Sequence, residues 1–310
     1  KKLNKKNISF FSGVPDSILK DFCNKLSRFN SKKHIVAVNE GSAVSLGMGY
    51  FLSKKKIPCI YMQNSGLGNA INPLISIADK KVYSIPMLLL IGWRGSPSSK
   101  DEPQHMTKGK ITPDLLRLLN IKFCILKKKE DLNKLNKLLF YAKKNNRPVA
   151  CLIEKNTLYA KKKIIIEQKK KYLTRNDFIN KFLIEIPKKS KIISTTGYTS
   201  RELFQIRNKN KIINGKDFYM VGGMGHASIV SLGVSLNSNQ QVFCIDGDGS
   251  LLMHMGSLRT NANFGGKNFK HIMLNNNAHE SVGGQLTYAN SIDFKNLTKS
   301  LGYKNYFKIT

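Results

Sequence analysis

The chain has 310 residues, 41% of them hydrophobic, which is enough for two domains of ordinary size with buried cores. Its 52 lysine and arginine residues outnumber 19 aspartate and glutamate residues, giving a net charge of +33. Such a surplus raises nucleic acid, anionic membranes and small anions as partners. The lysines stand in scattered short runs, without zinc-ligand spacing, a basic-aromatic ladder or a paired-helix motif. We therefore expect a lysine-coated globular protein that does not bind nucleic acid.

The sequence offers no segment suited to a bilayer, because its longest apolar run, residues 85–93, is too short and is not placed as a signal peptide. The five cysteines form no CxxC pair, and four of them stand in apolar, strand-like runs. This pattern is typical of buried free thiols, which require a reducing compartment. We expect a cytoplasmic protein without a membrane partner.

Short apolar runs alternate with helical patterns along the chain. In the first half, strands are predicted at residues 34–38, 57–62, 87–93, 123–126 and 149–154. Lysine-rich residues 156–172 break the alternation, which then resumes with strands at 191–195, 241–246 and 271–276. This order predicts an α/β protein of two domains, 1–155 and 173–310, joined by a linker. Each domain is expected to be a mostly parallel sheet with helices on both faces.

An acidic residue between two glycines follows one of the predicted strands. The apolar run QVFCI leads directly into DGDGS, residues 246–250. Gly247 and Gly249 let the backbone turn sharply, and Asp248 then projects a carboxylate where parallel sheets bind ligands. Mg²⁺ prefers such oxygen ligands, usually shared with substrate phosphates. The triplet alone is equally compatible with a plain turn.

Three asparagines end the next predicted strand. Residues 250–274 have the pattern of a helix followed by a strand, and Asn275, Asn276 and Asn277 come directly after them. One strand–helix–strand step therefore places Asp248 and the asparagines at neighbouring strand ends. A carboxylate, a side-chain amide and a backbone carbonyl can then converge on one cation.

The spacing of GDG and the asparagines resembles the metal motif of the thiamine diphosphate (ThDP)-dependent enzymes. This resemblance implies a Mg²⁺ ion held by Asp248, Asn276 and the backbone carbonyl of Ala278. Asn275 is the alternative ligand, because the asparagine run leaves the register open. The resemblance also implies two ThDP-binding-fold domains, a pyrimidine-binding domain at 1–155 and a diphosphate- and metal-binding domain at 173–310.

The same resemblance implies a catalytic acid in the first domain. ThDP enzymes place a glutamate beside N1′ of the cofactor's aminopyrimidine, just after a strand of that domain. Here Glu40 follows the predicted strand 34–38 and opens a helix of small residues. A glutamate at a helix start is also favoured by the helix dipole alone. Together with the GDG motif, Glu40 is predicted to be the catalytic acid.

Two further stretches, STTGYTSREL at 194–203 and VGGMGHAS at 221–228, match cofactor-binding segments of the family. By resemblance, Met224 would support the bent conformation of the cofactor, and Gly222 would offer a backbone contact to its pyrimidine. A buried core methionine is the alternative for Met224. The implied cofactor-binding residues are Glu40, Thr196, Gly197, Tyr198, Gly222, Met224, Asp248, Gly249, Ser250 and Asn276.

Motifs over residues 10–305 resemble those of the phosphonopyruvate decarboxylase family, namely FFSGVPDS, QNSGLGNAINPL, GWRG, DEPQH, TTGYTSREL, GGMGHAS, MHMGSL and NNAHESVGGQ. Two positions depart from the expected pattern, since Asn277 stands where glycine is expected and Tyr198 where lysine is expected. The strand and helix that usually finish the second domain are missing, so we expect a truncated C-terminal end.

The reaction that this resemblance implies is ThDP- and Mg²⁺-dependent decarboxylation of 3-phosphonopyruvate to phosphonoacetaldehyde and CO₂, a step of phosphonate biosynthesis. Sulfopyruvate or another 2-oxo acid is the alternative substrate. Carboligation is disfavoured because such enzymes normally carry a third domain, for which 310 residues leave no room. The non-enzymatic alternative is a basic protein that binds anions or nucleic acid, and the intact Glu40, Asp248 and Asn276 argue against it.

A substrate with a carboxylate and a phosphonate should be bound by cations. Arg94 in GWRG and Lys108 beyond DEPQH are the predicted candidates, although either could be an ordinary surface cation.

Histidines and polar residues in the matching motifs are predicted to handle protons and the oxyanion. His105 and His279 are expected to be catalytic, and Asp16 and Gln104 to contact the substrate. His226 is a weaker candidate. The remaining histidines are predicted to be structural: His34, His254 and His271.

The subunit arrangement also follows from the resemblance. In ThDP enzymes the two domains that share one cofactor come from different subunits. We therefore expect a homodimer or higher oligomer with the active site at the subunit interface, and a small anionic 2-oxo acid as substrate.

Overall fold

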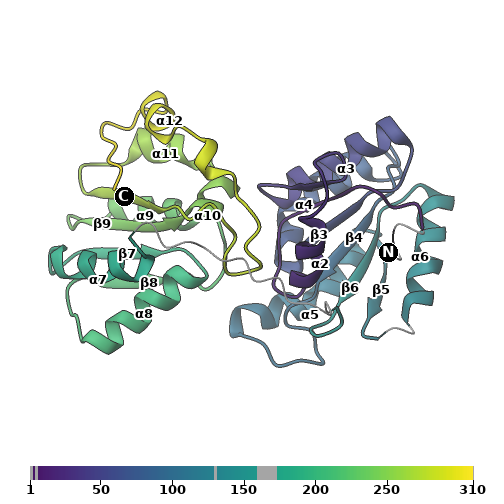
Figure 1. The fold of residues 1–310 in the computed structure, drawn as a ribbon, viewed down its shortest axis with the longest axis horizontal. Helices are drawn as coiled ribbons and strands as arrows, with labels where there is room; N and C mark the ends of the chain where they lie inside the picture. Colours follow the sequence, from purple (N-terminus) through teal and green to yellow (C-terminus); the bar gives the residue numbers. More distant parts are fainter. Residues whose placement is uncertain (1–2, 4–5, 129–130, 159–172, 310) are drawn as a thin grey trace. The chain divides into compact units, whose positions relative to one another are not determined.

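The computed structural model describes residue 3 and residues 6–128, 131–158 and 173–309. The chain divides into two compact units, of which the first contains strands β1–β6 and the second strands β7–β10 (Figure 1). Most of the predicted linker, 156–172, lies outside the described residues, so the domain bounds stay a prediction. Within the described part of the chain, every helix is too short or too polar to cross a membrane.

Six parallel strands form the sheet of the first unit, in the order β2-β1-β3-β4-β6-β5. Their bounds are Phe11–Gly13 (β1), His34–Val36 (β2), Cys59–Gln63 (β3), Leu88–Gly92 (β4), Lys122–Leu126 (β5) and Val149–Ile153 (β6). Strands β4 and β6 are buried along their whole length. Continuous burial of this kind is expected of apolar strands that helices cover on both faces.

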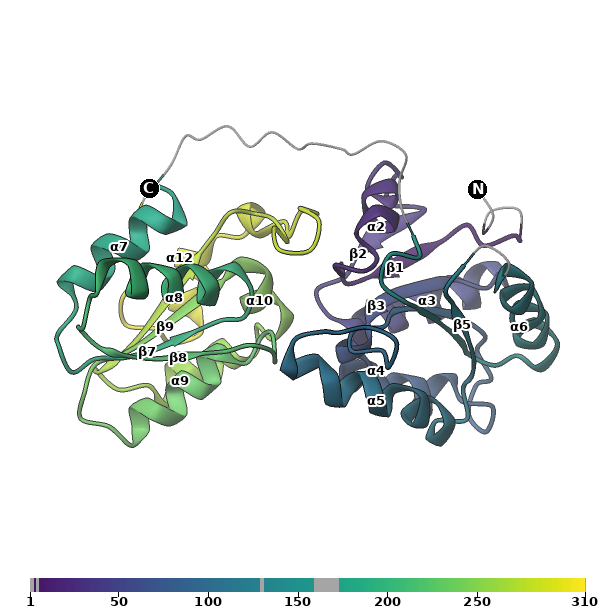
Figure 2. The same cartoon turned by 90° about the horizontal axis from the view of Figure 1, so that it is seen from below.

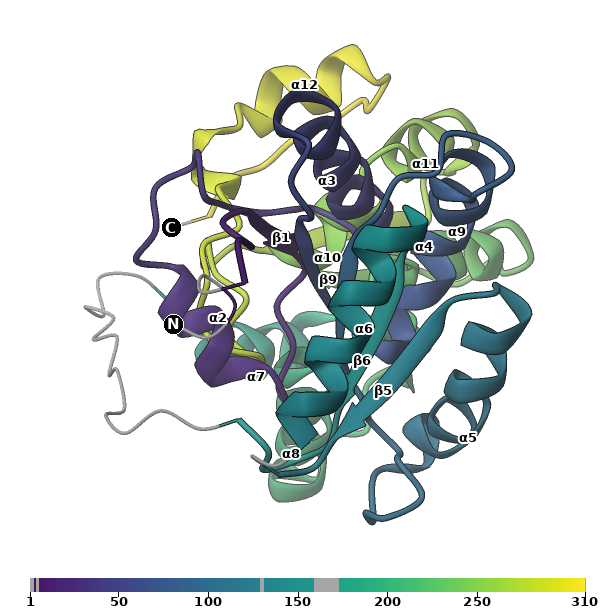
Figure 3. The same ribbon diagram turned by 90° about the vertical axis from the view of Figure 1, so that its right-hand side faces the viewer.

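Helices cover both faces of this sheet, and each face has its own apolar cluster. The helical elements are α2 (Lys20–Leu26), α3 (Glu40–Lys54), η1 (Asn64–Gly66), α4 (Leu67–Pro73), η2 (Leu74–Ala78), α5 (Pro103–Leu118) and α6 (Leu132–Asn145). Helices α4 and α5 lie on one side of the sheet and α2 on the other (Figure 2). Helix α6 lies over β5 and β6 (Figure 3).

The second unit has a parallel sheet of four strands in the order β10-β9-β7-β8. The strands are β7 (Lys191–Ser194), β8 (Lys216–Tyr219), β9 (Val242–Gly247) and β10 (Phe269–Leu274). The helices are α7 (Arg175–Glu185), α8 (Tyr198–Asn210), α9 (Ala227–Leu236), α10 (Asp248–Met253), α11 (Ser257–Phe264), η4 (Ala289–Ser291) and α12 (Phe294–Ser300). Helices α7 and α8 cover one face of the sheet and α9 the other (Figure 2).

The prediction of an α/β protein with two parallel sheets is confirmed. Strand β1 is the one strand of the first sheet that the sequence pattern does not predict, because it has only three residues and ends in glycine. It nevertheless lies between β2 and β3 and is fully buried. Gly13 allows this close packing, since a Cβ there would stand 2.0 Å from the carbonyl oxygen of Tyr61.

The parallel arrangement brings the carboxyl ends of the strands to one edge of each sheet. In the second unit, Gly247 of β9 pairs with Leu274 of β10, so Asp248 and Asn275 follow at adjacent positions. In the first unit, β2 ends shortly before Glu40 and β3 ends directly before Asn64. Ligands of parallel α/β sheets bind at this edge. The fold therefore places the predicted site residues of each unit where a ligand is expected.

His34, at the start of β2, is buried against Tyr61 of β3. Its Nε2 lies 2.8 Å from the Tyr61 hydroxyl, and the residue is 7% exposed. Burial lowers the pKa of His34 to about 4, because the charged ring would lose its hydration. The folded first unit therefore favours the neutral form of His34.

We expect the free energy of unfolding of the first unit to fall as the pH drops from 6.5, the ordinary pKa of histidine, to about 4. In this interval the unfolded chain binds a proton at residue 34 that the folded chain does not, which costs up to roughly 3 kcal/mol. The variant His34→Gln should lack this share of the pH dependence. Urea unfolding followed by the fluorescence of Trp93, the single tryptophan, measures it. Equal pH dependence in the two proteins would contradict the assignment.

Candidate active site

Glu40 is the first residue of α3 and follows β2 closely. The helix begins there because Asn39 adopts an extended backbone and its side chain accepts a hydrogen bond from the backbone nitrogen of Ser42 at 2.8 Å. Glu40 is only 5% exposed. The cap therefore holds a carboxyl group out of water at the ligand-binding edge of the first sheet.

Asn69 and Gly66, which both follow β3 in the chain, hold the Glu40 carboxyl group in place. Asn69 in α4 donates from Nδ2 to Glu40 Oε2 at 2.8 Å. Gly66 in η1 packs against the same group, and an added Cβ would stand 2.2 Å from Oε1. Any larger residue at position 66 would therefore have to displace the carboxyl group. Among the described residues, Glu40 forms no ion pair.

Asp16 is a second buried carboxyl group of the first unit, with 0% exposure. Gln63, the last residue of β3, donates to it from Nε2 at 2.7 Å, and the backbone nitrogens of Ile18 and Leu19 donate at 3.0 and 3.2 Å. Burial raises the pKa of Asp16 against the lowering effect of these hydrogen bonds. The segment from Gln63 to Asn69 thus contacts both predicted carboxyl groups, Asp16 and Glu40.

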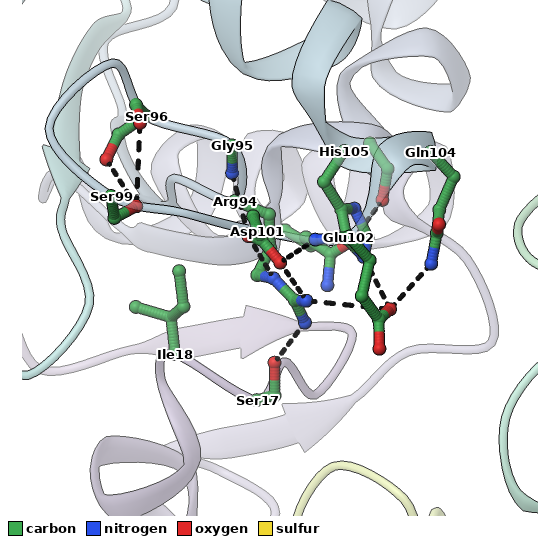
Figure 4. A network of polar contacts seen from close by, with 12 residues as sticks. Ser17, Ile18, Arg94, Gly95, Ser96, Ser99, Asp101, Glu102, Gln104 and His105 are labelled. Carbon is green, nitrogen blue, oxygen red and sulfur yellow. Dashed lines mark hydrogen bonds and ion pairs between the residues drawn. The ribbon is translucent and has the colours of Figure 1, made fainter.

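Arg94, shortly after β4, is the centre of a polar network (Figure 4). Its Nε donates to Asp101 Oδ2 at 2.7 Å, its Nη2 donates to Asp101 Oδ1, and its Nη1 donates to Ser17 Oγ at 3.2 Å. Asp101 also accepts from the backbone nitrogens of Gly95 and Glu102, each at 2.9 Å. Hydrogen bonding to the Arg94 guanidinium holds the pKa of Asp101 well below its usual range.

Arg94 has a partner that the sequence analysis does not select. Asp101 compensates its charge in a bidentate pair, and Glu102 Oε2 lies 3.8 Å from Nη2. Nη1, outside the pair, donates one hydrogen to Ser17 and keeps a second. Arg94 therefore holds the loop between β4 and α5, and its contact with the substrate anion stays a prediction.

Helix α5 carries the other predicted residues of this segment in its first turns. Gln104 donates from Nε2 to Glu102 Oε2 at 2.6 Å, and His105 Nε2 lies 3.8 Å from the same oxygen. Burial, assisted by the charge of Arg94, lowers the pKa of His105. Lys108 follows His105 by three residues on α5, so the two side chains leave the same side of the helix. Lys108 forms no ion pair with any residue that the structure describes.

In the second unit, Asp248 begins α10 directly after β9 and is 3% exposed. The hydroxyl of Thr287 donates to its Oδ2. Burial raises the pKa of Asp248, whereas Thr287 and the backbone N–H groups of Gly249 and Ala278 lower it. No lysine or arginine of the described chain forms an ion pair with this carboxyl group. Among the described residues, hydrogen-bond donors alone act on this buried carboxyl group.

Asn275 and Asn276 are both exposed after β10, and each is held by hydrogen bonds. Asn276 Oδ1 accepts from the backbone nitrogen of Ala278, and its Nδ2 donates to Glu280 Oε2, at 3.1 Å each. Asn275 bonds to Asn290 and Asn277 at 2.9 Å each. Asn276 as the metal ligand, with Asn275 as the alternative, therefore stays a prediction. Asn277 has φ of 56°, in the left-handed region where glycine and asparagine are both tolerated. This backbone conformation explains the departure from the expected glycine.

Ser250 joins the GDG motif to two other predicted cofactor segments. Its Oγ lies 2.8 Å from Thr195 Oγ1 and accepts a hydrogen bond from the backbone nitrogen of Gly225 at 3.0 Å. The ends of β7 and β9 and the loop before α9 therefore meet at Ser250. The sequence analysis does not select Thr195, and the cofactor contact predicted for Thr196 stays a prediction.

The remaining predicted cofactor residues lie in the loops that follow β7 and β8. Gly197, with φ of 93°, lies before α8, and Tyr198 is the first residue of that helix. Tyr198 is 38% exposed, with the guanidinium of Arg175 5.6 Å from its ring centroid. Gly222 and Met224 are half-buried in the loop before α9, and a Cβ on Gly222 would meet no atom within 4 Å.

His279 and His226 occupy different environments. His279 is 8% exposed and packs on Gly249, where an added Cβ would stand 2.8 Å from the ring. Burial lowers the pKa of His279 to about 4, so the ring is neutral at physiological pH. His226 is exposed and stacks on His254 with ring centroids 4.6 Å apart. His279 thus lies beside the GDG motif.

The donor set around Asp248 fits Mg²⁺. It offers a carboxylate, the Asn276 amide oxygen and the carbonyl of Ala278, all hard oxygen ligands of the kind Mg²⁺ prefers. A buried carboxylate without a cation is unfavourable, and a divalent ion would compensate it. Asp248, Asn276 and Ala278 are therefore the residues that would hold the metal.

Comparison with known proteins gives two family matches. The model of the thiamine pyrophosphate enzyme N-terminal TPP binding domain matches residues 1–117, and that of the C-terminal TPP binding domain matches residues 194–310. Thiamine pyrophosphate is another name for ThDP. These matches cover both the segment with Glu40 and the segment with Asp248.

Three relatives align with most of the chain. The phosphonopyruvate decarboxylase of Streptomyces viridochromogenes is 32% identical over 96% of this chain and 77% of its own length. That of Streptomyces hygroscopicus is 31% identical over 96% and 76%, respectively. The sulfopyruvate decarboxylase of Methanosarcina acetivorans is 30% identical over 89% and 74%.

The chain therefore belongs to the family of thiamine pyrophosphate (ThDP)-dependent enzymes. Within this class it is a carboxy-lyase similar to phosphonopyruvate decarboxylases. The family predicted from the motifs is confirmed, and with it the organisation into two ThDP-binding domains.

Several residues of the site are missed by sequence reasoning. Asn69 holds Glu40, Thr287 holds Asp248, and Asp101 neutralises Arg94. Asn69 and Asp101 stand inside motifs that match the family, QNSGLGNAINPL and DEPQH, so a family alignment could select them. Thr287 has no local signal, because its contact with Asp248 joins residues far apart in the sequence.

We expect Gly66→Ala to lower kcat for decarboxylation by about 100-fold or more, because the new methyl group displaces the carboxyl group of Glu40. The matched control is Gly68→Ala in the adjoining helix, where a Cβ meets no atom within 4 Å. The test is to measure steady-state kinetics and ThDP binding for both variants. Equal kcat values for the two variants would contradict the packing.

We expect Thr287→Val to raise the Mg²⁺ concentration required for ThDP binding by about 10- to 100-fold, since the Asp248 carboxylate loses its hydroxyl donor. Calorimetric titration of ThDP at a series of Mg²⁺ concentrations measures this. The control is Thr298→Val, which removes a hydroxyl that donates to the backbone carbonyls of Phe294 and Lys295 within α12. An unchanged Mg²⁺ requirement in Thr287→Val would refute the role of Thr287.

Proposed function

We propose that the protein decarboxylates 3-phosphonopyruvate to phosphonoacetaldehyde and CO₂, with ThDP and Mg²⁺ as cofactors. The observation that carries this proposal is the alignment of 96% of the chain with phosphonopyruvate decarboxylases at 31–32% identity. Buried Glu40 and buried Asp248, each at the ligand edge of its own sheet, support it.

Glu40 is the proposed acid of the reaction. When bound, ThDP supplies an electron sink next to the carboxylate that is lost as CO₂. The chain's task at the aminopyrimidine is to hold a proton at N1′, and a buried carboxyl group whose orientation is set by Asn69 and Gly66 suits that task. Burial also keeps water from competing for the same hydrogen bond.

Asp248, Asn276 and the carbonyl of Ala278 are proposed to hold Mg²⁺ and, through it, the diphosphate. Ser250, Gly249 and the Thr196–Tyr198 stretch would bind the diphosphate oxygens or the aminopyrimidine, and Gly222 and Met224 would contact the rings. Neutral His279, packed on Gly249, is proposed to donate or accept one proton near the reacting carbon.

Lys108 is the proposed cation for the phosphonate group. It is half-buried, lies on the same side of α5 as His105 and forms no ion pair with the described residues. His105 and Gln104 are proposed to contact the substrate too, as is Asp16, a buried acid whose pKa is raised. Arg94 keeps the loop in place by its pair with Asp101.

Sulfopyruvate is the alternative substrate. The observation that favours it is the 30% identity with the sulfopyruvate decarboxylase of Methanosarcina acetivorans over 89% of the chain. Sulfonate and phosphonate have similar shapes and differ in charge, so the same cations would bind either group.

A second copy of the chain is proposed to complete the site. A groove of about 920 Å³ runs along α3, α4 and η2 and is lined by small residues such as Gly41 and Ser45 together with apolar ones such as Leu46 and Ile77. An exposed apolar groove of this kind is a candidate protein interface. The groove begins directly after Glu40, so a partner subunit seated there would adjoin the proposed acid. Five free thiols agree with a reducing compartment, and we place the protein in the cytoplasm.

CO₂ release with ThDP and Mg²⁺ tests the proposal, with phosphonopyruvate, sulfopyruvate and pyruvate compared as substrates. We expect kcat/KM to be highest for phosphonopyruvate, and Glu40→Gln to lose about 100- to 10,000-fold in kcat. Glu185→Gln, a change at an exposed helix residue, is the control. Preference for sulfopyruvate would overturn the substrate but keep the mechanism. Full activity in Glu40→Gln would overturn the role of Glu40.

A further inference from the structure

The second sheet contains a cluster of potential metal ligands outside the site described above. Cys244 and Asp246 lie on β9, and His271 lies on β10 in register with Cys244. One ligand atom from each of the three side chains lies within 4.8 Å of the others. Because alternate residues of a strand face the same side, all three side chains lie on one face of the sheet.

The three side chains are deeply buried. Cys244 is 0% exposed and Asp246 1%, while the side chain of His271 is 6% exposed. The opposite face of β9 holds Phe243 and Ile245, which belong to the apolar cluster with α7 and α8. The cluster is therefore enclosed within the second unit.

The three side chains act on one another. Nε2 of His271 lies 3.4 Å from Asp246 Oδ2. Burial would lower the pKa of His271, but Cys244 and Asp246 raise it well above its ordinary value. The hydroxyl of Tyr303 interacts with His271 and Asn261. A buried thiol, carboxyl group and imidazole therefore stand close enough together for one cation to bind all three.

We propose that Cys244, Asp246 and His271 form a site for a single Zn²⁺ ion. One sulfur, one nitrogen and one oxygen donor make a set that zinc binds well and that Mg²⁺, which prefers oxygen, does not. In a tetrahedral zinc site with bonds of about 2.0–2.1 Å, nitrogen and oxygen ligands stand about 3.3 Å apart. The 3.4 Å between His271 Nε2 and Asp246 Oδ2 matches this edge.

The fourth coordination position has a candidate occupant. Tyr303 lies near enough to His271 and Asn261 for both to affect the pKa of its phenol, which burial raises. Its hydroxyl, or a water molecule held by Tyr303 and Asn261, would complete a closed tetrahedral site. Closed sites of this kind are structural rather than catalytic.

The ion would link two strands at a functionally important place. Asp246 is two residues before Asp248, and His271 lies on the strand that leads to Asn276. Zinc would therefore hold β9 and β10 together just before the loops that carry the Mg²⁺ ligands. This inference concerns a second metal of different chemistry, and it does not depend on which substrate the enzyme uses.

Metal analysis of the purified chain tests the proposal. Protein produced with added zinc is dialysed against a chelator, and bound metals are counted by mass spectrometry. We expect about one zinc ion per chain in the wild type, and less than about a tenth of that in Cys244→Ser. Cys151→Ser, a buried thiol of the first unit, should keep its zinc. Asp248→Asn should also keep it, which separates this site from the Mg²⁺ site.

Cobalt provides a second readout that does not depend on the variants folding. Wild-type protein refolded with Co²⁺ should show the thiolate-to-cobalt charge-transfer absorption of a tetrahedral site, and Cys151→Ser should show it too. Absence of both zinc and this absorption in the wild type would overturn the proposal and leave a buried His271–Asp246 ion pair. Retention of zinc in Cys244→Ser would equally contradict the assigned ligands.

Discussion

The structure depends on keeping two carboxyl groups, those of Glu40 and Asp248, buried at the ligand edges of two parallel sheets. A buried carboxyl group is costly unless hydrogen bonds or a cation compensate it. Each has few protein partners: Asn69 for Glu40, and Thr287 with backbone N–H groups for Asp248. Both carboxyl groups can form further hydrogen bonds or bind a cation, and a cofactor and a metal ion would use this capacity. The glycines packed against both sites, Gly66 and Gly249, follow from the same requirement, because a side chain there would occupy the space.

Surface and interior of the described chain differ in charge. Among the acidic residues that the structure describes, five are buried: Asp16, Glu40, Asp131, Asp246 and Asp248. No described lysine or arginine is buried to the same degree. This agrees with the expectation of a globular protein coated with lysine, and it leaves acids as the charged groups of the interior.

The sequence predicts the fold well because both sheets are parallel and their strands are continuous apolar runs. Strand β1 is not predicted in this way, because a segment of three residues that ends in Gly13 is too short to form an apolar run. Glu40 and Asp248, which stand in motifs, lie after strands as predicted, and their roles in catalysis and metal binding stay predictions. Contacts between distant residues are not: Thr287 reaches Asp248 only through the folded loop after β10. For Arg94, the sequence analysis does not identify Asp101 as a partner. A sequence motif shows that a cation is present, but not whether another residue already pairs with it.

The central claim is that Glu40 and Asp248 serve one reaction centre built from two subunits, and mixed oligomers test it most directly. Subunits carrying Glu40→Gln and subunits carrying Asp248→Asn are each expected to be inactive as homo-oligomers. Co-expressed with different tags and purified as a mixed dimer, they should recover about half of the wild-type activity, because one of the two shared sites is then intact. A mixed dimer as inactive as its parents would contradict the account, since it would mean that each chain uses its own Glu40 and Asp248.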